Sequence, residues 1–385
     1  RVGFAANVHP GTVIRGGYAR VFFRDNTGPQ VPFADPPYVF TYAPNPSTTT
    51  LSTPLPIPAP QSVTNLSGAI RGMQLDYKNS HVDEASFNVE QSFGATVLTA
   101  GYVGVFGRNL RISPDLDFAP PSPVSYITRR PFYSVLPNVT STPHIESSGY
   151  SNYNAMQVSL QRRLNGGLTA NANYTWSHII SDTQGYSQGG LYTSALPYQT
   201  ATLERGNGDL DIRQRFALML NYQIPFGASL TGWRGGLIKG WQVNAIDVWQ
   251  TGFPFTVVNG SPQSDTGIGS DRPNVVGNPI VSNPSIHRWF NASAFTPQPF
   301  GTIGNEARDA LYGPHFRHFD LSLFKIFALT ERLHLETRAE SFNLTNTPNF
   351  ALPNATLGTT STGTISSTRT GSTPRQLQFA MRLTF

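Results

Sequence analysis

The sequence contains no cysteine, so disulfides, thiolate metal sites and cysteine nucleophiles are excluded. It also has no apolar stretch long enough for a membrane-spanning helix. The longest uncharged run, 36–70, is rich in proline, serine and threonine. Charged residues make up 13% of the chain, about half the usual share in globular proteins. The net charge is +5, but the lysine and arginine residues are spread along the chain and form no continuous run. A nucleic-acid partner is therefore not expected.

Glycine and proline are abundant instead, with 35 and 31 residues, and aromatic residues reach 12%. Glycine and proline disfavour helix interiors and suit strand ends and loops, which predicts an all-β protein. A chain of 385 residues could form two or more average domains, but a large β-barrel forms one domain of this size. We therefore expect a single β-domain over 1–385.

The clearest strand pattern is at the end of the chain, over 375–385. One side of this segment would carry Leu377, Phe379, Met381, Leu383 and Phe385, and the other Gln376, Gln378, Ala380, Arg382 and Thr384. About ten alternating residues are enough to cross a bilayer at a tilt. A soluble sandwich strand would show the same alternation, but it seldom ends on an aromatic residue with no polar tail. We interpret the segment as the closing strand of an antiparallel outer-membrane β-barrel.

Similar alternation along the chain predicts about eleven strands. They are expected at about 1–8, 12–24, 81–91, 95–106, 153–162, 168–177, 216–224, 240–251, 319–327, 333–344 and 375–385. The strand at 240–251 is the least regular, because Ile246 and Val248 break parity with Val243 and Ala245.

Long and short connections alternate along the chain between these strands. The long ones are expected at about 25–80, 107–148, 182–207, 253–314 and 345–374. Bacterial outer-membrane barrels have short periplasmic turns and long extracellular loops, so we interpret all five as extracellular and disordered. Segment 25–80 could instead be a linker between domains, but strands of the same character resume after it.

The strand count suggests an incomplete barrel. Eleven is odd, whereas single-chain bacterial barrels have even numbers, and eleven is half of the 22-stranded class with a plugged lumen. The chain begins without an initiator methionine or a signal peptide. We expect the C-terminal half of a 22-stranded barrel, which alone would form an open curved sheet with two unpaired edges.

Several short motifs, taken in order, carry a resemblance to a known family. They are Thr12–Tyr18 (TVIRGGY), Tyr153–Gln157 (YNAMQ), Tyr174–Ser177 (YTWS), Asp211–Phe216 (DIRQRF), Gly240–Gln242 (GWQ), Asp271–Asn274 (DRPN), Ala339–Asn346 (AESFNLTN) and the terminal Phe385. This ordered set resembles TonB-dependent receptors. The branch it is most similar to is the Oar-like transporters, which carry an N-terminal carboxypeptidase-regulatory-like domain.

The resemblance implies an outer-membrane receptor for energised uptake or binding of a bulky solute, with no enzymatic chemistry and no cofactor. In that family a 22-stranded barrel encloses a plug domain, and the inner-membrane TonB complex pulls on a short N-terminal box. No segment here can be assigned to the plug, the box, the regulatory-like domain or the first half of the barrel. The implied partners are outer-membrane lipid, the plug and missing barrel half, the TonB complex indirectly, and the barrel-assembly machinery. The signal for that machinery would be Phe385 with Leu383 and Phe379. The alternatives are a structural or adhesive outer-membrane barrel without transport and, more remotely, a soluble secreted β-sandwich adhesin.

Charged residues at a period of two mark a face that cannot meet lipid, where a charge would cost roughly 2–4 kcal/mol at the midplane. The set is His334, Glu336, Arg338 and Glu340 on one strand, with Arg213 and Arg215 on another. We expect these side chains to face the lumen, where they would contact the plug or line the substrate path. The alternative is an ion-pair ladder that only satisfies lumenal charge.

Aromatic residues at strand ends suggest a membrane girdle. Tyr174, Trp176 and Tyr222 are expected at the membrane interface. Stacking on sugar rings, together with Trp241 and Trp249, is the alternative for these side chains. The substrate-binding residues stay unknown, although the loops 107–148 and 253–314 are where a ligand would first dock.

Other candidate sites do not fit. His315 and His318 near Asp320 are no metal cluster, because strand positions three apart point to opposite faces. The segment Asp265–Asp271 lacks the ligand order of a calcium loop. The sequence has no Ser/His/Asp grouping and no GxSxG, HExxH or phosphate-binding motif.

Overall fold

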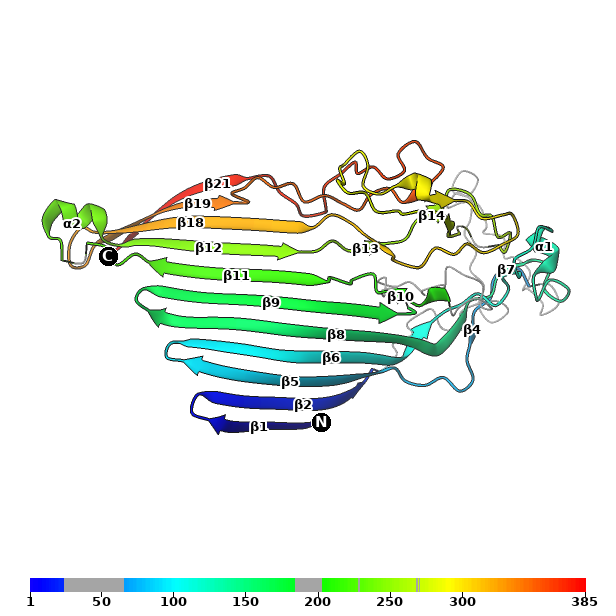
Figure 1. Ribbon diagram of the computed structural model, residues 1–385, viewed down its shortest axis with the longest axis horizontal. Helices are drawn as coiled ribbons and strands as arrows, with labels where there is room; N and C mark the ends of the chain where they lie inside the picture. The colour runs from blue at the N-terminus through cyan, green and yellow to red at the C-terminus, as the bar shows by residue number, and fades with distance from the viewer. Residues whose placement is uncertain (24–65, 184–202, 228, 268, 270) are drawn as a thin grey trace, which may run out of the picture.

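The computed structural model describes residues 1–23, 66–183 and 203–385, apart from 228, 268 and 270. One large antiparallel sheet dominates this part of the chain (Figure 1). Its main path places eleven strands side by side in chain order. The eleven strands are β1 (Val2–His9), β2 (Thr12–Phe22), β5 (His81–Phe93), β6 (Thr96–Ile112), β8 (His144–Asn165), β9 (Leu168–Ser181), β11 (Gln214–Gln223), β12 (Trp241–Gln250), β18 (Phe316–Ala328), β19 (His334–Phe342) and β21 (Gln376–Thr384). Two short strands lie off this path: β4 (Gly72–Met73) pairs with β8, and β10 (Gly206–Asn207) pairs with β9.

The predicted antiparallel sheet of about eleven strands is confirmed. Among the described strands, β1 and β21 are the two ends of the path and do not pair with each other, so the sheet is open. Several strands are longer than predicted, and both β6 and β8 extend into the segment 107–148 that was expected to be a loop. Strand β12 pairs regularly, with Ile246 opposite Asp320 and Val248 opposite His318. Its alternation looked poor because both of its faces carry apolar side chains.

The connections divide between the two ends of the sheet (Figure 1). At one end lie tight hairpins whose glycines adopt positive φ, such as Gly11 (78°) and Gly166 (63°), a conformation that side chains with a Cβ rarely tolerate. The β11–β12 connection at this end contains the helix α2 (Gly232–Ile238). The described parts of the long connections lie at the other end, which also holds α1 (Tyr126–Arg129). Among the described residues, no helix combines the length and the apolar character needed to cross a membrane.

Cross-strand register separates the sheet into two faces. The apolar face carries Leu377, Phe379, Met381 and Leu383 of β21, and pairing carries it across to Leu321 and Leu323 of β18, Leu218 and Leu220 of β11, Met156 and Val158 of β8 and Phe87 and Val89 of β5. The polar face carries Gln376, Gln378 and Arg382 of β21 and the residues that alternate with the apolar set. The apolar side chains stay solvent-exposed in the isolated chain, Phe379 to 79% and Met381 to 80%, because no second layer covers them.

Ion pairs lie along the border of the apolar face that is nearest the long loops. Arg20 bonds Asp83 at 2.7 Å between β2 and β5, and Arg317 lies 3.9 Å from Asp247 between β18 and β12. All four residues belong to the apolar face by register. A membrane-facing band should be flanked by such charges where the strands leave the hydrocarbon region.

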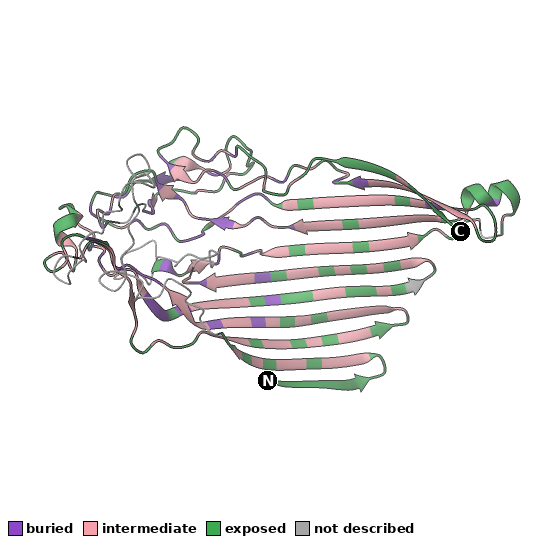
Figure 2. Ribbon diagram, turned by 180° about the vertical axis from the view of Figure 1, so that it is seen from behind, coloured by how far each residue is buried: buried purple, intermediate pink, exposed green. Residues whose placement is uncertain are grey.

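The buried apolar core lies in the long loops rather than in the sheet. We define the loop cap as residues 251–315 and 343–375. Its core consists of Phe255, Val257, Phe290, Ala294, Phe295 and Leu357. Figure 2 shows buried residues gathered at this end of the molecule, while most of the sheet is intermediate or exposed.

The prediction of disordered loops is therefore wrong for the segments 253–314 and 345–374. They form the short strand pairs β13–β17 (Pro254–Phe255 with Leu311–Tyr312), β15–β16 (Asn274–Val275 with Phe295–Thr296) and β14–β20 (Val258–Asn259 with Thr356–Leu357). Most of the predicted loops 25–80 and 182–207 lie outside the described residues.

Candidate ligand-facing site

The polar face carries the row of charges that the sequence singled out. Cross-strand pairing places Glu336 opposite Arg382 and Glu340 opposite Gln378. Arg338 donates to Glu336, and its guanidinium lies 4.9 Å from the centre of the Phe324 ring. The row thus contains one ion pair and is not a continuous ladder among the described residues.

Arg215 belongs to the same polar face, because it pairs with Gln250 and Thr175. Arg213 precedes β11, and its carbonyl accepts a 3.0 Å hydrogen bond from the Ser177 amide. His334, Glu336, Arg338 and Glu340 share the face of Arg215 through the register of β11, β12, β18 and β19. The geometry brings these residues onto one surface, and their contact with a plug or a solute stays a prediction.

Side-chain amides bond one another across the middle of the polar face. Asn221 donates to Asn244 at 2.7 Å, and Gln242 donates to the same Asn244 oxygen at 2.9 Å. Asn173 donates to Asn171 at 2.9 Å. Amide groups both donate and accept hydrogen bonds, so this surface can bind a polar solute or a protein backbone without a fixed charge.

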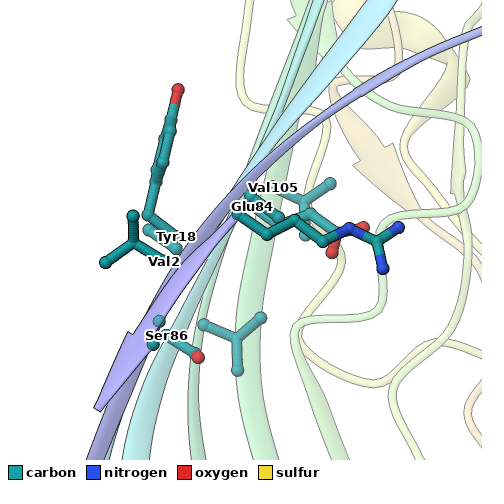
Figure 3. A pocket seen from close by; sticks show the side chains of 11 residues that line it. Val2, Tyr18, Glu84, Ser86 and Val105 are labelled. Atoms are coloured by element: carbon teal, nitrogen blue, oxygen red, sulfur yellow. The ribbon is translucent and has the colours of Figure 1, made fainter.

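A hollow of about 590 Å³ lies beside the unpaired edge of β1. Figure 3 shows Val2 and Tyr18 on one side of the strands and Glu84 and Val105 on the other. Small residues such as Gly3 and Gly17 thin the sheet here. The hollow is therefore an open surface along the unpaired edge of β1, and no polar groups converge on it that would hold a ligand.

The loop cap contains two smaller pockets that are better formed. One, of about 250 Å³, is lined mainly by apolar side chains, including Phe255, Pro279, Ile280, Trp289, Phe290 and Tyr312. The other, of about 330 Å³, is more polar and is lined by residues that include Asn259, Ser261, Gln263 and Thr359. Binding pockets typically combine aromatic walls with a few placed polar groups. The cap thus offers concave surfaces in the segment where the sequence predicts that a ligand first docks.

Arg308 anchors the loop cap to the ends of β9 and β10. Its Nη2 donates to the Ser181 carbonyl at 2.6 Å, the Ser181 hydroxyl at 2.8 Å and the Asn207 carbonyl at 3.1 Å. The side chain is buried, and Asp309 lies 3.9 Å from its Nε. A second link runs through the Asp211 carboxylate. It accepts one hydrogen bond from the Tyr312 hydroxyl at 2.7 Å and another from the Ile179 amide of β9 at 2.7 Å.

Buried carboxylates beside this anchor have raised pKa values. Burial raises the pKa of Asp309 to about 6, and the neighbouring Asp209 carboxylate contributes in the same direction. Burial likewise raises the pKa of Glu306 to about 7, although the nearby Arg272 opposes the shift. Burial and the Asp211 carboxylate raise the pKa of Tyr312. The anchor therefore holds protonated carboxyls in mildly acidic solution.

We expect the loop cap to lose stability as the pH rises from about 4 toward 7. A carboxyl whose folded-state pKa is raised stabilises the folded state in full at low pH, and the contribution is lost as the group ionises. The slope for the one proton on Asp309 would not exceed about 1.4 kcal/mol per pH unit. Hydrogen exchange of residues 251–315, corrected for the intrinsic exchange rate, would measure it.

The matched control is Asp309→Asn, since asparagine keeps the shape and tolerates the φ of 52° at this position. The variant should have a flatter dependence of cap stability on pH between about 4 and 6, the range between the ordinary and the raised pKa of Asp309. An identical profile in wild type and variant would contradict the role of Asp309.

Residues of the resemblance motifs build the loops. The Asp271 carboxylate accepts hydrogen bonds from the Ser264 amide at 2.7 Å and the Ser264 hydroxyl at 2.8 Å. Asn343, with φ of 49°, directly follows β19, and its side chain bonds the backbone of Thr347 and the Thr373 carbonyl. Sequence reasoning gave these polar residues no role, and their only local signal is the preference of Asp and Asn for turns.

The metal interpretations stay unsupported. His318 and Asp320 share the polar face and lie 2.8 Å apart, whereas His315 precedes β18. Asp265 contacts Arg129 through its carbonyl at 2.6 Å, and so links the loop cap to the 113–143 connection. Within the described ranges, no group of three His, Cys, Asp or Glu residues could hold a metal ion.

The predicted girdle residues lie on the apolar face at two levels. Tyr174 pairs with Phe216, and Trp176 pairs with Met156. Tyr222 lies six residues from Phe216 along β11, roughly 20 Å at strand spacing. Aromatic belts occur at both membrane interfaces, which fits this separation.

Residues 1–378 match the family described as Outer membrane beta barrel domain. The chain belongs to this family. Together with the exposed apolar face, this places the barrel domain in the bacterial outer membrane. A search of the curated proteins found no match.

Solved structures similar to the barrel domain include one transporter and two receptors. The outer membrane transporter YddB from Escherichia coli is 10% identical with a TM-score of 0.46, and the match covers 96% of this chain and 38% of that one. The ferripyoverdine receptor of the outer membrane of Pseudomonas aeruginosa is 10% identical with a TM-score of 0.48, covering 100% and 32%. The siderophore receptor PiuA from Acinetobacter baumannii is 11% identical with a TM-score of 0.46, covering 98% and 34%. The barrel domain thus spans about a third of their length, and likenesses this low carry no argument about its ligand.

Proposed function

We propose that this barrel domain is the C-terminal part of a TonB-dependent outer-membrane receptor of the Oar-like branch, which takes up or binds a bulky solute. The observation that carries the proposal is that the described residues form an open path of eleven strands, whose first and last strands each have one unpaired edge. In hydrocarbon each unpaired backbone group costs several kcal/mol, so both edges need partner strands. A second set of eleven strands would satisfy both edges and complete a 22-stranded barrel, a size that leaves room for a plug. The ordered motifs from Thr12–Tyr18 to Phe385 support the same family.

In this proposal the apolar face meets lipid and the polar face lines the lumen. The long connections and the loop cap lie outside the cell, and the short hairpins face the periplasm. A solute would first meet the aromatic and polar pockets of the cap and then the amide-rich surface with His334, Glu336, Arg338, Glu340, Arg213 and Arg215. Phe385, Leu383 and Phe379 would be read by the barrel-assembly machinery, and the plug would transmit the pull of TonB. We propose no catalytic step for these residues.

The size of the native protein in outer-membrane fractions tests this proposal. An antibody to the closing strand should detect a band of about twice 42.0 kDa or more on denaturing electrophoresis, as a full 22-stranded barrel with its plug requires. A membrane band at 42.0 kDa would contradict the transporter and favour a structural or adhesive barrel. A band confined to the soluble fraction would contradict the barrel itself.

A further inference from the structure

A furrow runs over the apolar face at its short-hairpin end. Small side chains of β19, Thr337 and Ala339, form its floor. Leu323, Lys325 and Trp241 form one wall, and Phe379 and Met381 of β21 form the other. Its volume is about 330 Å³, and both walls come from described strands, so the furrow does not depend on what pairs with the edge of β21.

The helix α2 is fastened beside this furrow by two side chains of the apolar face. The Trp241 indole N–H donates to the Leu237 carbonyl at 2.9 Å, and the buried Lys325 ammonium donates to the Lys239 carbonyl. The ammonium also lies 5.5 Å from the Trp241 ring centre and 4.9 Å from that of Phe327. These bonds satisfy carbonyls at the C-terminal end of the helix and hold α2 on the apolar side of the sheet.

Apolar and basic side chains of α2 remain uncovered. Trp233 is 73% exposed, and Leu237 is 56% exposed. Arg234 is exposed and lies over the Trp233 ring at 5.4 Å, and the half-buried Lys239 directly follows the helix. The connection 224–241 contains no Asp or Glu, and the neighbouring turn 329–333 adds one acid and one base, which cancel. The side chains of these two segments therefore carry a net positive charge.

We propose that the furrow and α2 form a binding site for one anionic phospholipid of the periplasmic leaflet. An acyl chain would lie in the furrow over Ala339, and the headgroup phosphate would be bound by Arg234 and Lys239. Lys325 is buried and acts as a positioning residue that fixes α2. Two observations favour this occupant: the furrow is continuous with the lipid-facing surface, and the segments 224–241 and 329–333 at its outer end together carry more basic than acidic side chains. The leaflet assignment rests on the orientation in the proposed function, whereas the binding site itself does not.

Native mass spectrometry of the full chain in mild detergent tests the site. The delipidated protein is titrated with dioleoyl phosphatidylglycerol or with the zwitterionic dioleoyl phosphatidylethanolamine, and the bound lipids are counted. Wild type should retain one phosphatidylglycerol with a preference of roughly 25-fold, since each of the two basic residues near a membrane surface contributes roughly a factor of five. The double variant Arg234→Gln/Lys239→Gln should bind both lipids equally.

Filling the furrow provides the second arm. Ala339→Trp should abolish retention, and the milder Thr337→Leu should weaken it if the tryptophan variant fails to fold. The matched control is Ala172→Trp, which adds the same bulk to the apolar face between Leu160 and Leu218, away from the furrow. Equal retention of both lipids by wild type, or unchanged retention when the furrow is filled, would overturn the site. Neither result would bear on the size of the native protein, so the lipid site and the proposed function can fail separately.

Discussion

Replacing Arg308 with methionine is expected to release the loop cap from the sheet. The variant removes the donor for the Ser181 carbonyl, the Ser181 hydroxyl and the Asn207 carbonyl, and it leaves the buried Asp309 without its cation. Breaking a buried charged network by removing one partner costs roughly 3–5 kcal/mol, because the remaining groups stay buried and unpaired. The local opening free energy of residues 251–315, measured by hydrogen exchange, should fall by that order.

The control for this experiment is Arg288→Met in the same loop. Arg288 is exposed, and its one side-chain hydrogen bond within the described residues is a 3.1 Å bond to Asn291. Its replacement should change the opening free energy by less than about 1 kcal/mol. If Arg308→Met protects the cap as well as Arg288→Met does, the aromatic core around Phe290 holds the cap by itself, and Arg308 is not its anchor.

Placing arginine on the apolar face is expected to block membrane assembly. Leu220 lies in the middle of β11 on that face, between Ala170 and Ala245. Leu220→Arg should cost roughly 2–4 kcal/mol, because the charge would be placed near the bilayer midplane. Folding into lipid vesicles from urea, followed by the shift in electrophoretic mobility between unheated and heated samples, would measure the loss.

The neighbouring residue gives a matched control. Met219 is also apolar, but it lies on the polar face opposite Asn171 and is 60% exposed. Met219→Arg should assemble nearly as well as wild type, since its charge would face water in the lumen. The reverse outcome, with Leu220→Arg tolerated and Met219→Arg lost, would show that the assignment of the two faces is inverted.

The sheet could be predicted from the sequence because its signal is local. Apolar and polar residues alternate with a period of two within a single strand, as in Leu168–Ser177 and Arg375–Phe385. Where this local signal weakened, the prediction weakened with it. In β12 both faces carry apolar residues, so parity alone could not define the strand, and pairing with β11 and β18 defines it.

The loop cap could not be predicted in the same way. Arg308 is 127 residues from Ser181 and 101 from Asn207, and Tyr312 is 101 residues from Asp211. No short window of sequence contains both partners of such a contact. The segment 253–314 was interpreted as a disordered loop because it is a long connection between two strands, whereas the aromatic residues Phe255, Phe290 and Phe295 within it pack into a core.

The sequence by itself determined the strand period, the apolar and polar faces, the placement of long and short connections and the outer-membrane family. These properties follow from which residues alternate and where turns interrupt them. Only the tertiary structure decided that the long loops form a cap with its own core, that buried carboxylates gather around Arg308, and that α2 is fastened beside a furrow on the apolar face. Each of these depends on residues from distant strands or loops being brought within bonding distance, which the register of the whole sheet sets and no local pattern contains.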